Sequence, residues 1–231
     1  MQRRKFTPGI VAAGGLWALA ARSPVQAARI TESDAALGVR AALERGANSA
    51  IALLGRSGGF LDNPKVRIPL PGFLNEAAKV LKFTGQQQRI DELVMAMNRA
   101  AEAAVPQAKT LLVSAVKAMS VEDGKQILGG GDNSVTNFFA SKTRAPLSVT
   151  FLPIVTKATE KVALADKYNA VAGKAAAFGL VGKDDVDIQH YVTGKALDGL
   201  YLMIGEEERK IRQDPIGTGS TILRKVFGSL R

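Results

Sequence analysis

Apolar residues recur three and four positions apart along most of this chain, which is the spacing of one helix face. No stretch of useful length alternates apolar and polar residues as a half-buried strand would, and no internal repeat is found. The pattern therefore predicts an all-α fold. The longest helical run lies between Arg89 and Phe139, and we expect the other helices to cover it. Its apolar face is formed by Ile90, Leu93, Val94, Met97, Ala101, Ala104, Ala108, Leu111, Leu112, Ala115 and Met119.

Pro106 interrupts this long run. Proline has no N–H to donate to the carbonyl of Glu102, and its ring crowds the preceding turn. The apolar spacing continues in register on both sides, so we expect one kinked helix. The alternative is a helix that ends near Ala104 and a second that has Pro106 in its first turn.

The other predicted helices begin at residues that favour the N-cap and end at glycine or before proline. The helix from residue 31 is capped by Thr31 or Ser33, and the short helix from residue 120 by Ser120. The helix through 135–139 is capped by Asp132, Asn133 or Ser134, and the last long helix by Asp184 or Asp185. Pro153 is expected to kink or to begin the helix over 145–177. The predicted ranges are 31–54, a short helix from Pro71 or Gly72 to Thr84, 120–129, one through 135–139, 145–177, a last long helix ending at Asp214, and a short one from Thr218 or Ser220 through Phe227.

These elements predict a single-domain multi-helix bundle over residues 28–231, with two long helices kinked at Pro106 and Pro153. Within one of them, Glu102 lies on a line with Asp91, Asn98 and Lys109, opposite the densest apolar stripe. We interpret this line as a solvated face, with an Arg99–Glu102 pair three residues apart. The alternative is a polar pocket at the kink.

Residues 1–27 have the pattern of a cleaved export signal. Two arginines and a lysine precede a mildly apolar, Gly- and Ala-rich stretch, which is shorter than the about 20 residues that span a bilayer. The arginine pair resembles the motif of the twin-arginine route, and the general secretory route is the alternative. The protein is therefore expected in the periplasm, with no membrane span in the mature chain. The signal is carried by Arg3, Arg4 and Phe6, and its cleavage site by Val25 and Ala27.

The composition excludes several chemistries. The 231 residues contain no cysteine and one histidine, His190, which excludes disulfides, thiolate metal sites and a histidine metal cluster within the chain. The formal charge is +10, and without the four basic residues of the signal the balance is 27 basic against 21 acidic residues. These charges are spread out and not interleaved with aromatic residues, so nucleic-acid binding is not expected. No cofactor motif is present.

Three local patterns resemble known sites and are better explained by structure. The glycines at 129–131 precede a helix, but the Lys-Ser/Thr ending of a phosphate-binding loop is missing, and a plain helix stop explains them. Gly55–Gly58 lacks the spacing and the preceding strand of a serine nucleophile elbow. His190 lies at the start of a helix and is expected to be a packed or surface side chain.

Several segments together resemble a bacterial family catalogued as domain-of-unknown-function family 4197. The resemblance implies an exported helical protein, and no activity comes with it. It covers nearly all of the chain after the signal, and the C-terminal segments are the most specific. The matching segments are Leu70-Pro71, 97–102 (MNRAAE), 123–130 with Thr136 and Phe139, 191–200 (YVTGKALDGL), Glu207-Glu208 through Ile211-Arg212 to Pro215, and 226–228 (VFG).

The candidate site is a polar cluster drawn from these segments. We expect Asn98, Thr136 and Asp198 to be buried polar anchors that fix how helices meet. The complete cluster is Asn98, Arg99, Glu102, Asp123, Thr136, Asp198, Glu207 and Arg212.

The pattern favours a non-enzymatic periplasmic binding or scaffold protein. Its partner is then an apolar small molecule between helices or another envelope protein. One alternative is a hydrolase-like enzyme that uses two carboxylates among Glu102, Asp123, Asp198 and Glu207. Another is a peripheral envelope protein that binds anionic lipid through its positive charge.

Overall fold

The computed structural model describes residues 32–72, 83, 85, 87–131, 134–160, 165, 166, 168, 169 and 187–214. Within these ranges the chain forms helices and no strand, which confirms the all-α prediction. The elements are α1 (Glu32–Leu54), α3 (Gln87–Ala104), the 3-10 turn η2 (Val105–Gln107), α4 (Ala108–Lys117), α5 (Val121–Gly129), α6 (Ser134–Thr159) and α8 (Ile188–Gln213).

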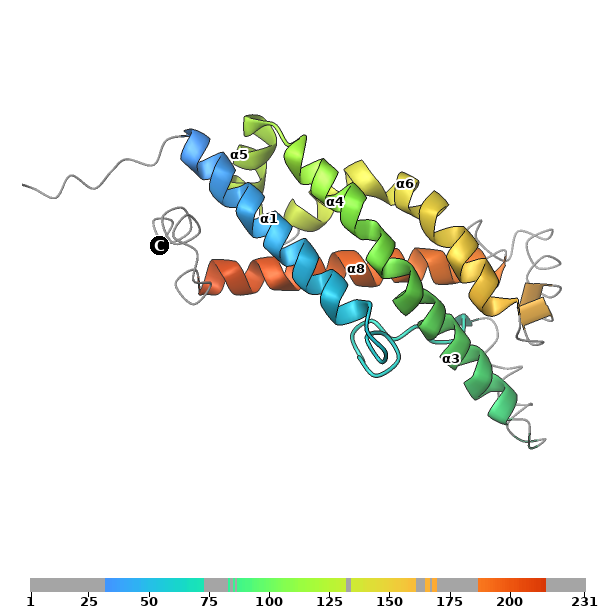
Figure 1. Cartoon of the computed structure of the whole chain (residues 1–231). Coiled ribbons are helices and arrows are strands. Elements are labelled where there is room, and N and C mark those ends of the chain that lie inside the picture. Colours follow the sequence, from blue (N-terminus) through green and yellow to red (C-terminus); the bar gives the residue numbers. More distant parts are fainter. Residues whose placement is uncertain are drawn as a thin grey trace, which may run out of the picture.

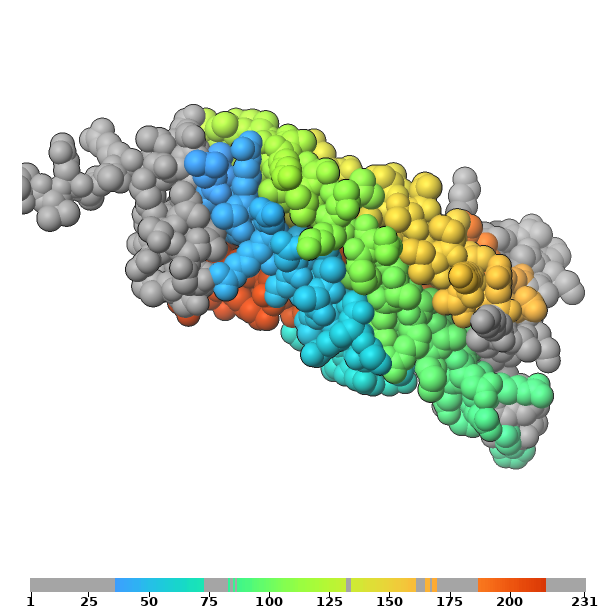
Figure 2. Space-filling view, in the orientation of Figure 1, coloured from blue at the N-terminus to red at the C-terminus, as the bar shows by residue number. Residues whose placement is uncertain are grey.

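Helix α8 is the element on which α1, α3 and α6 pack, whereas α4 and α5 pack on α1 and α6. It contacts α1, α3 and α6, and 14 of its 26 residues are buried, compared with 8 of 18 in α3. Figure 1 shows α1, the α3–α4 rod and α6 inclined side by side, with α8 crossing behind them. From the same side, α8 is visible in Figure 2 only at the margin of the surface. The last long helix, and not the Arg89–Phe139 run, therefore has the larger share of buried residues.

The chain passes Pro106 without leaving a helical path. α3 and α4 are joined by η2, and Ala104, Gln107 and Ala108 all have right-handed helical dihedral angles. Apolar residues on both sides of the turn, such as Met97 and Leu112, are fully buried. The apolar stripe continues across the turn as predicted. The segment is not one kinked α-helix, however, because α3 ends at Ala104 and α4 begins at Ala108, with Pro106 in a single turn of 3-10 helix between them.

Helix α6 corrects the prediction for residues 135–177. The structure has one helix from Ser134 to Thr159 that contains both Pro146 and Pro153, so neither proline begins a helix. Both prolines lie on the exposed side, where water can solvate the carbonyl that each leaves without a backbone donor. The predicted extension beyond residue 160 falls largely outside the described residues.

Among the helices whose N-caps the structure describes, α5 and α8 are capped by side chains. Ser120 caps α5 as predicted, and its hydroxyl accepts the N–H of Asp123 at 3.0 Å while the Asp123 carboxylate accepts the N–H of Ser120 at 2.9 Å. Asp187 caps α8 by accepting the N–H of His190 at 2.8 Å, so the helix begins later than a cap at Asp184 or Asp185 would place it. The His190 side chain is 52% exposed, which confirms a surface imidazole.

The sequence at the end of the last long helix predicts two ion pairs four residues apart, Glu206–Lys210 and Glu208–Arg212, and the structure has one of them. Glu208 pairs with Arg212, as the spacing of four indicates. Lys210 pairs with Glu207 at 2.5 Å, and not with Glu206. Glu206 instead pairs with Lys65 at 2.7 Å. Lys65 lies 141 positions earlier in the chain.

The buried apolar side chains of these helices and of the loop after α1 form one continuous core, which includes Phe60, Phe139, Phe151 and Tyr201. Among the described helices, none has the length and apolar character needed to cross a membrane. The predicted signal, the bulk of the short helix before Thr84 and the helix after Asp214 lie outside the described residues. Gly85, the predicted stop of that short helix, has a left-handed φ of +77°.

The Ser120–Asp123 capping box gives a prediction for stability. Replacing Asp123 with Ala should lower the free energy of unfolding by about 1 kcal/mol at pH 7, because it removes the carboxylate that accepts the N–H and the hydroxyl of Ser120 and leaves only the bond from the backbone N–H of residue 123 to that hydroxyl. The backbone and hydroxyl of Ser120 hold the pKa of Asp123 below 3.8. The difference from wild type should therefore be complete above that pH and disappear as the pH falls through the lowered value.

Urea denaturation at pH 7 and at successively lower pH measures this difference. Glu122→Ala is the control, since it removes a carboxylate from the same helical turn without touching the capping box. Equal effects of the two substitutions would show that charge near the helix N-terminus matters and the cap does not.

Candidate functional site

The buried carboxylate of Glu102 holds the loop that follows α1. One oxygen, Oε1, accepts the backbone N–H groups of Phe60 and Leu61, each at 3.1 Å. The other oxygen, Oε2, receives Nη1 of Arg99 at 2.6 Å, which confirms the predicted pair. The same Arg99 nitrogen lies 2.7 Å from Oγ of Ser57. A single carboxylate thus satisfies two backbone donors of a loop that has no regular structure.

Asn98 holds the same loop one helical turn earlier. Its side chain is fully buried, with Oδ1 accepting the N–H of Ile68 at 2.8 Å and Nδ2 donating to the Ile68 carbonyl at 2.9 Å. The second Nδ2 hydrogen bonds the carbonyl of Val94 at 2.8 Å. Asn98 therefore pairs with Ile68 much as a neighbouring strand would, and every polar atom of its amide is used.

These contacts overturn the interpretation of this helix side as a solvated face. Asn98 and Glu102 are buried, whereas Asp91 and Lys109 on the same line are exposed. The loop of residues 55–72 covers the middle of the line and leaves its two ends in solvent. Asn98 is a buried polar anchor as predicted, but it anchors a loop and not a second helix.

The loop reaches α8 through Phe60, which sequence reasoning missed. Phe60 is fully buried, and a Cβ atom built on Gly199 would lie 2.8 Å from its Cε1 and 3.2 Å from Cβ of Val66. Only a residue without a side chain fits at this contact. The signal in the sequence is a glycine in the interior of a long helix, where it lowers helix stability unless close packing requires it.

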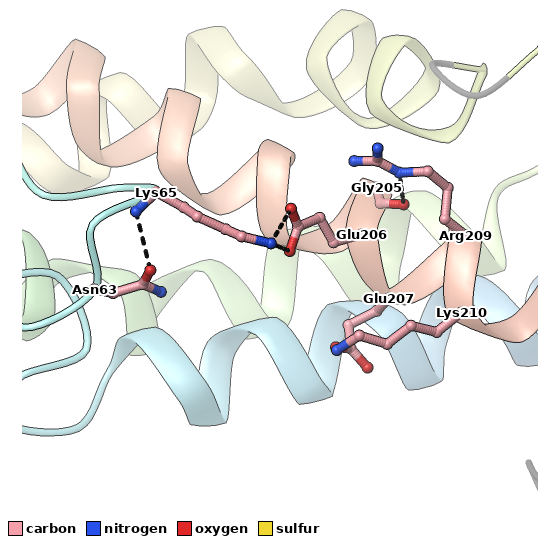
Figure 3. Close-up of polar contacts among 7 residues, drawn as sticks. All are labelled: Asn63, Lys65, Gly205, Glu206, Glu207, Arg209 and Lys210. Atoms are coloured by element: carbon pink, nitrogen blue, oxygen red, sulfur yellow. Dashed lines mark hydrogen bonds and ion pairs between the residues drawn. The ribbon is translucent and has the colours of Figure 1, made fainter.

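A groove lies between this loop and α8. It has a volume of about 550 Å³, and we call it the loop–α8 groove. The Lys65–Glu206 ion pair joins the loop to α8 at one end (Figure 3), and the Tyr191 hydroxyl donates to the Pro69 carbonyl at 3.0 Å at the other. The lining residues are Lys65, Val66, Arg67, Ile68, Pro69, Leu70, Gly72, Tyr191, Lys195, Asp198, Gly199 and Leu202.

The groove wall is basic. The Lys195 ammonium lies 5.8 Å from the centre of the Tyr191 ring, a cation–π distance. Asp198, the acidic residue of the lining, is bound by Arg144 from α6. Asp198 is therefore an exposed ion-pair partner, and the prediction that it is a buried anchor is wrong. Arg67 is exposed, and within the described part of the chain it has no carboxylate partner.

A buried tyrosine connects this wall to the core. The Tyr201 hydroxyl lies 2.9 Å from Oγ1 of Thr143, and the Arg144 guanidinium lies 5.5 Å from the centre of the Tyr201 ring. Burial raises the pKa of Tyr201, so the phenol keeps its proton. Arg144, fixed over this ring, is in position to bind Asp198.

Two predicted cluster residues lie at other helix contacts. Thr136 is half-buried, and its Oγ1 donates to the Tyr201 carbonyl at 3.4 Å. A Cβ atom built on Gly205 would lie 2.7 Å from the same oxygen, so Thr136 packs directly against the α8 backbone. It is thus a contact between α6 and α8. Arg212 donates to the Ile127 carbonyl at 2.7 Å, which ties the end of α8 to α5.

Glu207 and Asp123 lie apart from the loop–α8 groove. Glu207 accepts hydrogen bonds from Oγ of Ser49, a residue of α1, at 3.1 Å and from Lys210. Its side chain lies on a different side of α8 from that of Glu206 (Figure 3). Asp123 belongs to the α5 cap, beside two smaller hollows of about 310 and 480 Å³ between α4, α5 and α6. The structure therefore brings Asn98, Arg99 and Glu102 together and distributes the other five residues over separate contacts.

The four candidate carboxylates have separate partners. Glu102 binds backbone N–H groups and Arg99, Asp123 binds Ser120, Asp198 binds Arg144, and Glu207 binds Ser49 and Lys210. Within the described residues, no group of three or more His, Cys, Asp or Glu side chains is placed to hold a metal ion.

The anchoring of the loop predicts which substitution is most damaging. Glu102→Ala should lower the free energy of unfolding by about 2–4 kcal/mol, because two buried N–H groups lose their acceptor. Glu92→Ala, an exposed carboxylate on the same helix, should cost less than about 0.5 kcal/mol. Urea denaturation of both variants measures the difference. Equal, small effects would contradict the anchoring role of Glu102.

Comparison with known proteins places the chain in a family. A search of curated proteins and a search of solved structures each found no match. A family model described as "Protein of unknown function (DUF4197)" matches residues 29–228. That range includes the loop, both of its anchors and the whole of α8. The chain therefore belongs to the DUF4197 family.

Proposed function

We propose that this protein is a non-enzymatic binding protein of the periplasm and that the loop–α8 groove is its ligand site. The observation that carries the proposal is the construction of the groove. One wall is an irregular loop held by buried hydrogen bonds, and the other is the most buried helix of the fold. An open groove between a loop held by buried hydrogen bonds and a buried helix is the form expected of a preformed binding site.

The segments that carry the family resemblance support this choice. Leu70 of the Leu70-Pro71 turn lines the groove, and so do Tyr191, Lys195, Asp198 and Gly199 from the 191–200 segment. The 97–102 segment supplies Asn98 and Glu102, which hold the loop from the opposite side. Three segments separated by many residues in the chain thus contribute to one surface feature.

The contacts of the candidate carboxylates support a binding role over a hydrolytic one. A two-carboxylate mechanism needs an acid and a base that face the same bond. Glu102 and Asp123 bind backbone N–H groups that would otherwise lack an acceptor or a cap. Asp198 and Glu207 bind basic side chains. These partners give each carboxylate a structural task.

The sequence of residues 1–27 supports export to the periplasm. The arginine pair, the short apolar stretch and the small residues at Val25 and Ala27 have the order found in cleaved signals. The family match begins at residue 29, two residues after the proposed cleavage site. The protein would therefore act as residues 28–231.

The binding proposal predicts a bound molecule. Native mass spectrometry of the mature protein, purified from the periplasm of its own host, should show a mass excess that disappears on denaturation. Leu70→Asp with Leu202→Asp should abolish that excess, because both residues line the groove. Val149→Asp is the control, since Val149 is 76% exposed on α6 and outside the groove. An unchanged excess in the double variant would place the ligand elsewhere, and a clean apo mass in the wild type would contradict the proposal.

The export proposal has its own test. Replacing Arg3 and Arg4 together with Lys should leave the full-length precursor in the cytoplasm if the twin-arginine route is used. Fractionation with intact mass measurement shows where the protein is and whether its N-terminus is Ala28. A mature chain that reaches the periplasm in this variant would assign the general secretory route, and a wild-type chain that is never cleaved would contradict export.

A further inference from the structure

We infer that the ligand of the loop–α8 groove is a single-chain amphipathic anion, a long-chain carboxylate bound as a monomer. This inference rests on the proposed function and names the chemical class of the ligand.

The charge of the groove favours an anion. Four basic side chains lie at the groove, and two carboxylates, those of Asp198 and Glu206, offset part of their charge. The basic residues are Lys65, Arg67, Lys195 and Arg144, which reaches Asp198 from α6. Lys65 and Arg144 are engaged by these two carboxylates. Arg67 on the loop wall and Lys195 on the helix wall have no carboxylate partner within the described part of the chain. Two cations on facing walls are placed to bind one anionic head group.

The apolar surface of the groove favours a hydrocarbon chain attached to that head group. Leu202 is 39% exposed although it belongs to the most buried helix. Leu70 is half-buried on the opposite wall, and the Tyr191 ring lies in the same lining. Buried methylene groups contribute about 0.8 kcal/mol each. The lining therefore offers apolar contact next to the two available cations.

The shape of the groove favours one extended chain. Its lining residues on α8 run from Tyr191 to Leu202, which are about 16.5 Å apart at the helical rise of 1.5 Å per residue. Its volume of about 550 Å³ is within the range of small-molecule sites. A bilayer would meet a protruding surface, whereas this site is recessed between two walls. We therefore assign a monomeric ligand and not a lipid surface.

Calorimetric titration of the mature chain with dodecanoate, below its critical micelle concentration, tests this assignment. We expect saturable binding that weakens with added salt. Dodecyltrimethylammonium, with the same chain and the opposite charge, should bind at least tenfold more weakly. Affinity should rise about twofold per methylene from octanoate to dodecanoate, which is less than the about fourfold of full burial because the groove is open.

Variants locate the site. Lys195→Gln and Arg67→Gln should each weaken dodecanoate binding about fivefold. Leu202→Asn should lower the affinity for dodecanoate more than the affinity for octanoate. Lys157→Gln is the charge-matched control, because Lys157 is exposed on α6 and does not line the groove. Circular dichroism of each variant establishes that the fold is unchanged. All three groove residues are exposed, so their replacement should leave the core intact.

The outcomes separate this inference from the function on which it rests. If the cationic amphiphile binds as tightly as dodecanoate, and Leu202→Asn weakens both, the anionic class is overturned while the groove remains the site. If dodecanoate binds and neither Lys195→Gln nor Leu202→Asn changes its affinity, the anionic ligand class and the groove as the binding site are both overturned. Binding to phosphatidylglycerol vesicles without binding of monomeric dodecanoate would replace the monomer with a membrane surface and overturn the inference.

Discussion

The hydrogen bonds of Glu102 and Asn98 to the loop of residues 55–72 are the interaction on which the rest of this structure depends. An irregular segment packed against a helix has backbone donors and acceptors that must be satisfied away from water. Two side chains, one helical turn apart, satisfy three backbone donors and one acceptor of the loop. The loop is thereby fixed at defined positions, and its other face is available as the wall of a groove.

The helices accommodate this loop at a small number of close contacts. Gly199 lets Phe60 and Val66 approach the α8 backbone, and Gly205 does the same for Thr136 of α6. Glycine weakens a helix, but here it allows two other elements to contact the same helix. The prolines of α6 are tolerated for the complementary reason, since both lie on the exposed side, where water can solvate a carbonyl that lacks a donor.

The distribution of charge gives the groove its character. Over most of the described surface, basic side chains near carboxylates are paired with them, as Arg99, Arg144, Lys210 and Arg212 are. The exposed pair between Arg144 and Asp198 contributes little to stability, whereas the carboxylates of Glu102 and Glu208 are buried and need their basic partners. At the groove the carboxylates of Asp198 and Glu206 are already engaged. The excess of basic over acidic side chains there is a consequence of which residues the loop brings beside α8.

The sequence by itself determined the helical class, the α5 cap at Ser120, the ends of α1 and α8 and the pairs Arg99–Glu102 and Glu208–Arg212. These depend on residues within about one or two helical turns of each other, so local spacing is enough. Only the tertiary structure decided that Asn98 and Glu102 are buried while Asp91 and Lys109 are exposed, because a loop some 40 residues earlier in the chain covers part of one helix line. It also decided that Glu206 binds Lys65 and that α6 continues through two prolines. These outcomes depend on which segments meet in space, and helical periodicity carries no information about that.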